Sequence, residues 1–132
     1  MVMLTDLCRF ALVDRGGRRG RLVDVVTDLS ADEHPPVTDL IVRGPDGRAT
    51  LPWGSVVGVD WPDRRLTVSD LGAAEPVGAD QLLDATLLRR DVLDAMVIDL
   101  ANRRTTRAND LWLRDEHGRL RLRGVDVFGG GG

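Results

Sequence analysis

Apolar residues in the first half of the chain fall into short runs that turn-forming residues separate, a pattern typical of β-strands. Gly and Asp cluster at 14–17 and 44–47, and Pro62 with Asp63 marks a further turn. Two prolines exclude regular strand pairing from the loop at 30–36. Frequent turns between short strands indicate a small barrel or sandwich. The predicted strands of this half lie at 10–13, 20–29, 37–42, 49–59 and 66–68.

The second half follows a stretch rich in small residues, Pro and Gly, which predicts a linker at 73–80. The segment 81–100 combines helix-forming residues with β-like pieces. We therefore expect a helical turn around 90–94, flanked by strands near 86–88 and 96–98. The remaining predicted elements are strands at 111–113 and 120–127, a hairpin turn at 115–118 and a flexible glycine tail at 129–132.

The chain also resembles itself. Residues 18–51 align with 89–122 without gaps, with identity at about a third of positions, where roughly one in ten would match by chance. A second, gapped alignment pairs 12–14 with 97–99 and 23–24 with 109–110. Both alignments predict two related β units, and they disagree about where the second unit starts. The predicted units cover 1–72 and 81–128, the second of them incomplete.

Composition narrows the function classes. The formal charge is −3 and every basic residue is Arg, a balance that argues against nucleic-acid binding and against binding to a membrane surface. A single Cys excludes an internal disulfide and a Cys-based zinc site. No apolar run is long enough to insert into a bilayer, and the acidic N-terminus is unlike a signal peptide. We expect a cytoplasmic location.

The residues that most often carry catalysis are few. The only histidines, His34 and His117, lie in a proline loop and a predicted turn, and no Ser-His-Asp or His-x-x-x-His spacing occurs. Cys8 lies next to Arg9, and a neighbouring cation can activate a thiol. A small buried residue on a first strand is the favoured interpretation of Cys8. We therefore predict no enzymatic activity and no cofactor.

Acidic residues raise the question of a metal site, because Mg²⁺ prefers clustered carboxylates. Asp24 and Asp28 would share one strand face, but about 13 Å of strand rise separates them, too far to hold one ion together. Turn-capping and solvated carboxylates are the favoured interpretation, and no metal site is predicted. The acidic residues weighed in this way are Asp24, Asp28, Asp32, Glu33, Asp60 and Asp63.

The densest polar group in the chain starts at Asp99 and ends at Asp110. It could bind a partner, because the guanidinium groups of Arg pair with carboxylates. The favoured alternative is an internal network that fixes the conformation of the second unit. The tryptophans could pack in the core or anchor an interface. The candidate interaction residues are Arg104, Arg107, Asn109, Asp110, Trp112 and Trp61.

The first half resembles the PRC-barrel domains, a family named after the cytoplasmic part of the photosynthetic reaction-centre H subunit. These domains show an apolar-Asp turn, a Gly-x-hydrophobic-x-Asp strand, a Val-rich strand and a Pro-x-x-x-Val strand. The corresponding segments are 13–14, 20–24, 40–42 and 51–56, and 20–28 resembles the opening strand pair of these domains. The resemblance implies an all-β fold with minor α content: a small PRC-type β-barrel followed by a second, partial PRC-like unit.

The second half resembles the tandem PRC-type region that accompanies MgtE-type magnesium-transporter cytoplasmic domains and CBS domains. The matching segments are 88–94, 97–99, 107–110 and 124–127. This half has no equivalent of the Leu51-Pro52-Trp53 strand. The second unit therefore needs completion by the first unit, by a second chain or by sequence outside this one.

The resemblance implies a non-enzymatic regulatory or adaptor module with a link to the regulation of magnesium transport. Its expected partner is another protein or another domain of a longer parent, and unpaired edges favour a homodimer. One alternative is an accessory domain like the ribosome-maturation factors of the RimM type, which a continuous Arg stripe at 103–123 would favour. A magnesium-sensing domain is the other alternative.

Overall fold

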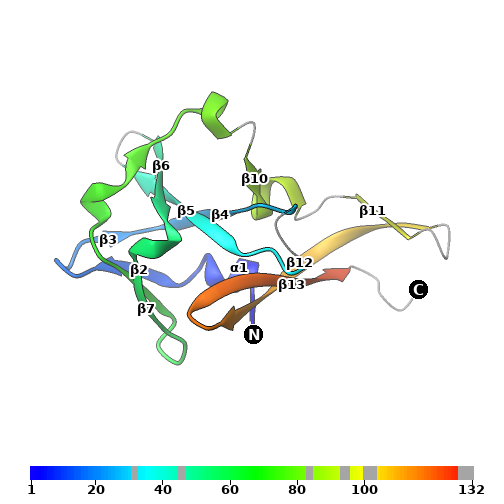
Figure 1. Ribbon diagram of the computed structural model, residues 1–132, viewed down its shortest axis with the longest axis horizontal. Coiled ribbons are helices and arrows are strands. Elements are labelled where there is room, and N and C mark those ends of the chain that lie inside the picture. Colours follow the sequence, from blue (N-terminus) through cyan, green and yellow to red (C-terminus); the bar gives the residue numbers. More distant parts are fainter. Residues whose placement is uncertain (31–32, 45–46, 83–84, 93–95, 100–103, 128–132) are drawn as a thin grey trace.

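The computed structural model describes residues 1–30, 33–44, 47–82, 85–92, 96–99 and 104–127, with no side-chain description at 79, 82, 96–99, 104–108 and 127. The described strands form three sheets with short helical turns between them (Figure 1). The prediction of an all-β fold with minor α content is confirmed. A closed barrel stays a prediction.

The strands are arranged as follows. A five-stranded sheet has the order β10 (Thr86–Leu87), β4 (Leu22–Thr27), β5 (Val37–Gly44), β6 (Gly47–Pro52) and β9 (Glu75–Pro76). A four-stranded sheet has the order β3 (Arg19–Gly20), β2 (Ala11–Asp14), β8 (Arg65–Val68) and β7 (Val56–Asp60). The third sheet has the order β1 (Val2–Met3), β12 (Arg104–Glu116) and β11 (Met96–Asp99), and β13 (Arg119–Val127) also pairs with β12.

Helical turns connect these strands. The helix α1 (Leu4–Leu7) lies at the N-terminus, and a π-helical turn, η4 (Leu88–Val92), lies between β10 and β11. The turn η4 fits the helical turn predicted around 90–94, of which residues 93–94 lie outside the described residues. The 3-10 turns are η1 (Trp53–Ser55), η2 (Leu71–Ala73) and η3 (Ala79–Leu82).

Local sequence signals placed most strands of the first half correctly. Leu66 and Val68 alternate with polar neighbours and are buried in β8, as the pattern predicts. The turn after β2 closes with a hydrogen bond from the Gly17 N–H to the Asp14 carbonyl (3.1 Å). Gly17 adopts φ 85°, a backbone conformation that glycine tolerates and other residues rarely do.

The predicted linker at 73–80 contains a paired strand. Within it, β9 pairs antiparallel with β6, where Ala49 lies opposite Pro76 and Thr50 opposite Glu75. Proline is tolerated there because β9 is an edge strand whose second side needs no donor. The glycine tail predicted at 129–132 lies outside the described residues.

One hydrophobic cluster contains residues of both predicted units. Leu4 and Leu7 of α1 are fully buried in it together with Leu111 and Leu113 of β12. The N-terminal strand β1 pairs with β12, with Val2 opposite Leu113. Packing thus joins the segments 1–72 and 81–128, while their division into two related units stays a prediction.

The strand pairs β4–β5 and β12–β13 share the same irregularities. Each pair contains two register shifts, the first ending at Asp24 in β4 and at Asp110 in β12. The second shift ends at Thr27 in β4 and at Leu113 in β12. The positions of the shifts correspond as in the gapped alignment, which pairs 23–24 with 109–110. The ungapped alignment pairs other residues at these positions.

The two halves also exchange their first strands. The strand β1 lies beside β12, with Met3 opposite Trp112. The strand β10 lies in turn beside β4, with Leu87 opposite Val26. Each half therefore adds one short strand to the sheet of the other half, an arrangement that makes neither sheet complete on its own.

Two buried aspartates also form hydrogen bonds between the two halves. The Asp24 carboxylate of β4 accepts hydrogen bonds from the backbone N–H groups of Arg89 (2.7 Å) and Arg90 (2.9 Å) in η4. The Asp110 carboxylate of β12 accepts the Thr5 backbone N–H (3.2 Å) in α1 and also the Thr5 hydroxyl. Each aspartate thus satisfies N–H groups that a helical turn leaves without an internal partner.

Candidate functional site

The candidate polar group on β12 is only partly described. Asp110 is 5% exposed, and besides Thr5 it accepts the backbone N–H of Leu111 (2.8 Å). Asn109 is exposed, and its Nδ2 donates to Asp126 Oδ2 on β13 (3.1 Å). The side chains of Arg104 and Arg107 lie outside the described residues. The described part of the group therefore consists of contacts inside the protein.

The candidate tryptophans are half-buried. Trp61 packs against the hydrophobic cluster and meets Phe10 edge-to-face, with the ring centroids 5.8 Å apart. Trp112 lies on β12 opposite Met3. Trp53 is 6% exposed, and its indole N–H donates to the Gly118 carbonyl in the turn after β12 (2.9 Å). The indole of Trp53 thus connects the first half of the chain to the second.

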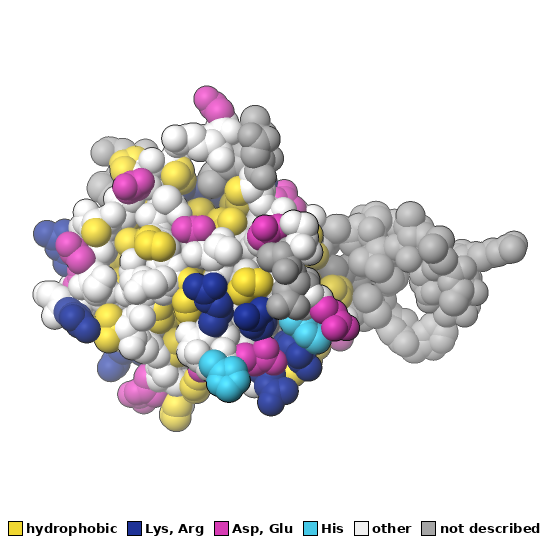
Figure 2. All heavy atoms as spheres, in the orientation of Figure 1, with side chains coloured by type: hydrophobic (Ala, Val, Ile, Leu, Met, Phe, Trp, Pro, Cys, Tyr) yellow, Lys and Arg dark blue, Asp and Glu magenta, His cyan; other side chains and the backbone are white. Residues whose placement is uncertain are grey.

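The histidines lie near charged side chains, and Figure 2 shows histidine side chains (cyan) on the surface beside basic and acidic groups. His34 Nδ1 lies 3.0 Å from Arg123 Nη1, and its carbonyl accepts a hydrogen bond from Arg121 Nη1 (3.1 Å). His117 adopts φ 55° in the turn between β12 and β13. Within the described part of the chain, no three His, Cys, Asp or Glu side chains are placed to share a metal ion.

Cys8 is buried, as predicted, but it follows α1 and does not lie on a strand. Its Sγ approaches the Val23 carbonyl (3.8 Å). Burial raises the pKa of the thiol from 9.0 to about 11, against the opposing influence of the nearby Arg89 guanidinium. A neutral thiol packed in this way serves as a small apolar group.

We expect Cys8 to react with a disulfide exchange reagent at pH 8 at least about 10-fold more slowly in the folded protein than in urea, because the raised pKa lowers the thiolate fraction and burial limits access to the sulfur. Absorbance of the released thiol measures both rates. Equal rates in the folded and unfolded protein would contradict the burial of Cys8.

Among the strands that the structure describes, none pairs with the outer edge of β13, whereas the corresponding edge of β5 pairs with β6. Leu40 on β5 pairs with Val25 on one side and with Leu51 of β6 on the other, and it is fully buried. Val125 pairs with Leu111 in the same way, yet it is 41% exposed. Among the described residues, the second side of β13 has only a bridge at Arg121 to the loop before β5.

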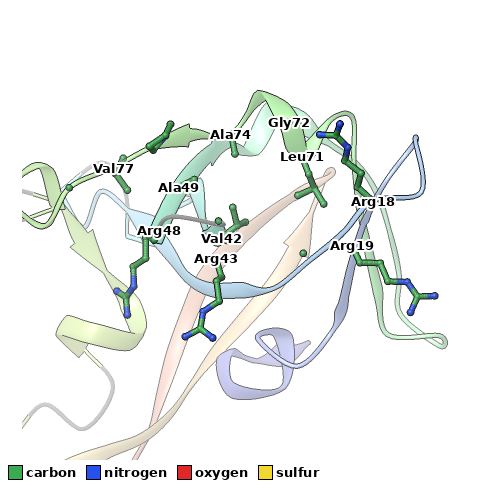
Figure 3. A pocket seen from close by; sticks show the side chains of 15 residues that line it. Arg18, Arg19, Val42, Arg43, Arg48, Ala49, Leu71, Gly72, Ala74 and Val77 are labelled. Carbon is green, nitrogen blue, oxygen red and sulfur yellow. The ribbon is translucent and has the colours of Figure 1, made fainter.

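A cleft rich in arginine lies at the end of the β5–β6 hairpin (Figure 3). It has two adjoining hollows that share Arg43 and Arg48. The first hollow has a volume of about 580 Å³. It extends over apolar side chains such as Leu71 and Val77 toward Arg18 and Arg19. The second, of about 390 Å³, is polar. We call the two together the arginine cleft, with the basic residues Arg18, Arg19, Arg21, Arg43, Arg48, Arg89 and Arg90.

The charges of the arginine cleft are poorly balanced. Arg43 and Arg48 lie directly opposite each other on neighbouring strands, and like charges in that position are destabilising. Neither of them, nor Arg21, forms an ion pair with any residue that the structure describes. Asp24 is the one acidic residue among the described residues that line the cleft, and its carboxylate accepts hydrogen bonds from backbone N–H groups.

The sequence interpretation did not include the arginine cleft. Its arginines come from four separate parts of the chain, and each looks like a solvated surface residue in isolation. The one available signal was the Arg-Arg pair, which occurs at 18–19 and again at 89–90 in the ungapped alignment. Both pairs line the cleft.

No helix in the described part of the chain has the length and apolar character needed to span a membrane. Comparisons of the chain with protein-family models, with curated proteins and with solved structures found no match.

Proposed function

We propose that this protein is a non-enzymatic cytoplasmic regulatory or adaptor module of the PRC-barrel type, which acts by binding other protein chains. The observation that carries the proposal is the open edge of β13 with its exposed Val125. Sheet edges bind added strands through their free backbone groups, and an exposed apolar residue on such an edge adds affinity. A link to the regulation of magnesium transport belongs to the same proposal, on the strength of the family resemblance.

A second copy of the chain is the simplest occupant of this edge. In the first half the equivalent edge takes an antiparallel strand, β6, which places Leu51 opposite Leu40. Two copies of β13 that meet antiparallel would each supply such a strand, and the contact would close with two-fold symmetry. Val125 of each copy would then lose its exposure to water.

The ribosome-maturation alternative draws less support. It requires a continuous basic stripe at 103–123, and Glu116 interrupts the described part of that stripe. The Glu116 carboxylate lies 3.7 Å from Arg121 Nε and 3.3 Å from Arg123 Nη1. Two of the arginines of the stripe therefore share a carboxylate, which weakens the attraction for a nucleic-acid backbone.

Sedimentation velocity across micromolar concentrations tests the proposal. We expect the wild-type chain to form dimers. Val125→Lys should raise the dissociation constant of the dimer at least about 10-fold, because it places a charge on the edge that the dimer would bury. Val57→Lys is the matched control, since Val57 is 47% exposed on β7, away from β13. A wild-type chain that stays monomeric, or an equal effect of both substitutions, would contradict self-association through β13.

A further inference from the structure

We propose that the arginine cleft binds an acidic peptide segment that carries an apolar side chain next to its carboxylates. The site uses no residue of β13 and is independent of the self-association proposed above. Its ligand would be a segment of a partner protein, recognised by charge and by one apolar contact.

Positive charge in the arginine cleft is only partly compensated. Arg90 pairs with Asp91 (2.7 Å), whereas Arg21, Arg43 and Arg48 form no ion pair with any residue that the structure describes. The chain has a net charge of −3, so these three arginines run against its overall balance. The like charges of Arg43 and Arg48, on neighbouring strands, destabilise the folded state. Arg21 lies beside this pair, because its carbonyl accepts the Arg43 backbone N–H (2.9 Å). An anionic ligand would relieve this repulsion, since guanidinium groups bind carboxylates through two parallel hydrogen bonds.

The shape of the cleft also favours a ligand with an apolar group. Figure 3 shows the side chains of Arg43 and Arg48 extending to the same side, with apolar side chains between them and the arginines of the β3 segment. The first hollow, at about 580 Å³, has the size of a small-ligand site and is far larger than a single anion needs. Its apolar lining includes Val42, Ala49 and Leu71. A ligand that fills it must combine negative charge with an apolar group.

The lining of the cleft favours one class of ligand. None of the described residues that line either hollow is aromatic, whereas sites for single-stranded nucleic acid usually stack bases on aromatic rings. The negative net charge of the protein also disfavours the approach of a long polyanion. Carboxylates match the arginines of the cleft, and a neighbouring aliphatic side chain matches the apolar lining of the first hollow. An acidic peptide therefore fits better than an oligonucleotide or a free phosphate.

The binding test uses a fluorescently labelled, capped peptide of alternating Glu and Leu, titrated with the full chain and followed by anisotropy. We expect a dissociation constant in the micromolar range that rises with salt. Peptides of alternating Gln and Leu and of alternating Glu and Ser should bind at least about 10-fold more weakly, because each lacks one of the two features. Inorganic pyrophosphate and an oligouridylate serve as competitors.

Substitutions locate the site. Arg43→Gln and Arg48→Gln should each weaken binding of the Glu-Leu peptide about 10-fold, while Arg65→Gln, on an exposed position of β8 outside the cleft, should leave it unchanged. Removal of either member of the like-charged pair should not lower the unfolding midpoint, so a loss of binding would not reflect unfolding.

Several outcomes would overturn the inference: equal affinity for the Glu-Leu and Gln-Leu peptides, equal effects of Arg43→Gln and Arg65→Gln, or displacement of the peptide by pyrophosphate or oligouridylate at lower concentration than unlabelled peptide. The last result would assign the cleft to a phosphate-bearing ligand. The titration is repeated with Val125→Lys, so that a failure of peptide binding is distinguished from a failure of self-association.

Discussion

Asp24→Ala is expected to lower the free energy of unfolding by about 2–4 kcal/mol, because it leaves buried N–H groups without an acceptor. The Asp24 side chain is 2% exposed, and its carboxylate accepts the backbone N–H groups of Val25 (2.8 Å), Arg89 (2.7 Å) and Arg90 (2.9 Å). Urea titration monitored by circular dichroism measures the change.

Two further variants separate the causes of this loss. Asp24→Asn keeps one acceptor oxygen and removes a charge whose burial raises the pKa of Asp24, so it should cost less than Asp24→Ala. Asp28→Ala removes an exposed carboxylate whose hydrogen bonds, among the described residues, are to Ser30, and it should change stability by no more than about 0.5 kcal/mol. Equal losses for Asp24→Ala and Asp28→Ala would contradict the role of Asp24 as a cap across the two halves.

Leu111→Ala is expected to cost about 2–5 kcal/mol, the range for a large-to-small change in a packed core. Leu111 is fully buried on β12, in the same hydrophobic cluster as Leu4 and Leu40. Because one cluster includes both halves, the whole chain should unfold in one transition, and the variant should shift that transition as a unit. Tryptophan fluorescence and circular dichroism together follow it.

Leu29→Ala is the control for this prediction. Leu29 is 49% exposed, so its replacement should change stability by no more than about 0.5 kcal/mol. Two separate transitions, of which Leu111→Ala shifts only one, would show that the halves fold independently and would contradict a shared core.

Predictions from the sequence succeeded where local chemistry decides the structure. The turn at 14–17 depends on an Asp-Arg-Gly-Gly sequence, and the hairpin turn at 115–118 ends with Gly118 at φ 81°. Both turns need only residues a few positions apart. The short helix α1 gave no such signal, because four residues are too few to show a helical period.

The candidate site was harder to predict for the same reason. Asp24 looks like a solvated strand residue until η4 places two N–H groups against it. The guanidinium groups of the arginine cleft come from positions as far apart as Arg18 and Arg90. Neither contact depends on neighbours in the sequence, so neither leaves a local pattern.

The sequence by itself determined the β-rich class and the turns, because these depend on side-chain chemistry over a few residues. Only the tertiary structure decided that β1 and β10 exchange between the halves, that one core joins them, and that Val125 stays exposed while Leu40 is buried. Strand pairing and burial join residues far apart in the chain, and only packing in three dimensions selects among the pairings that a local pattern allows.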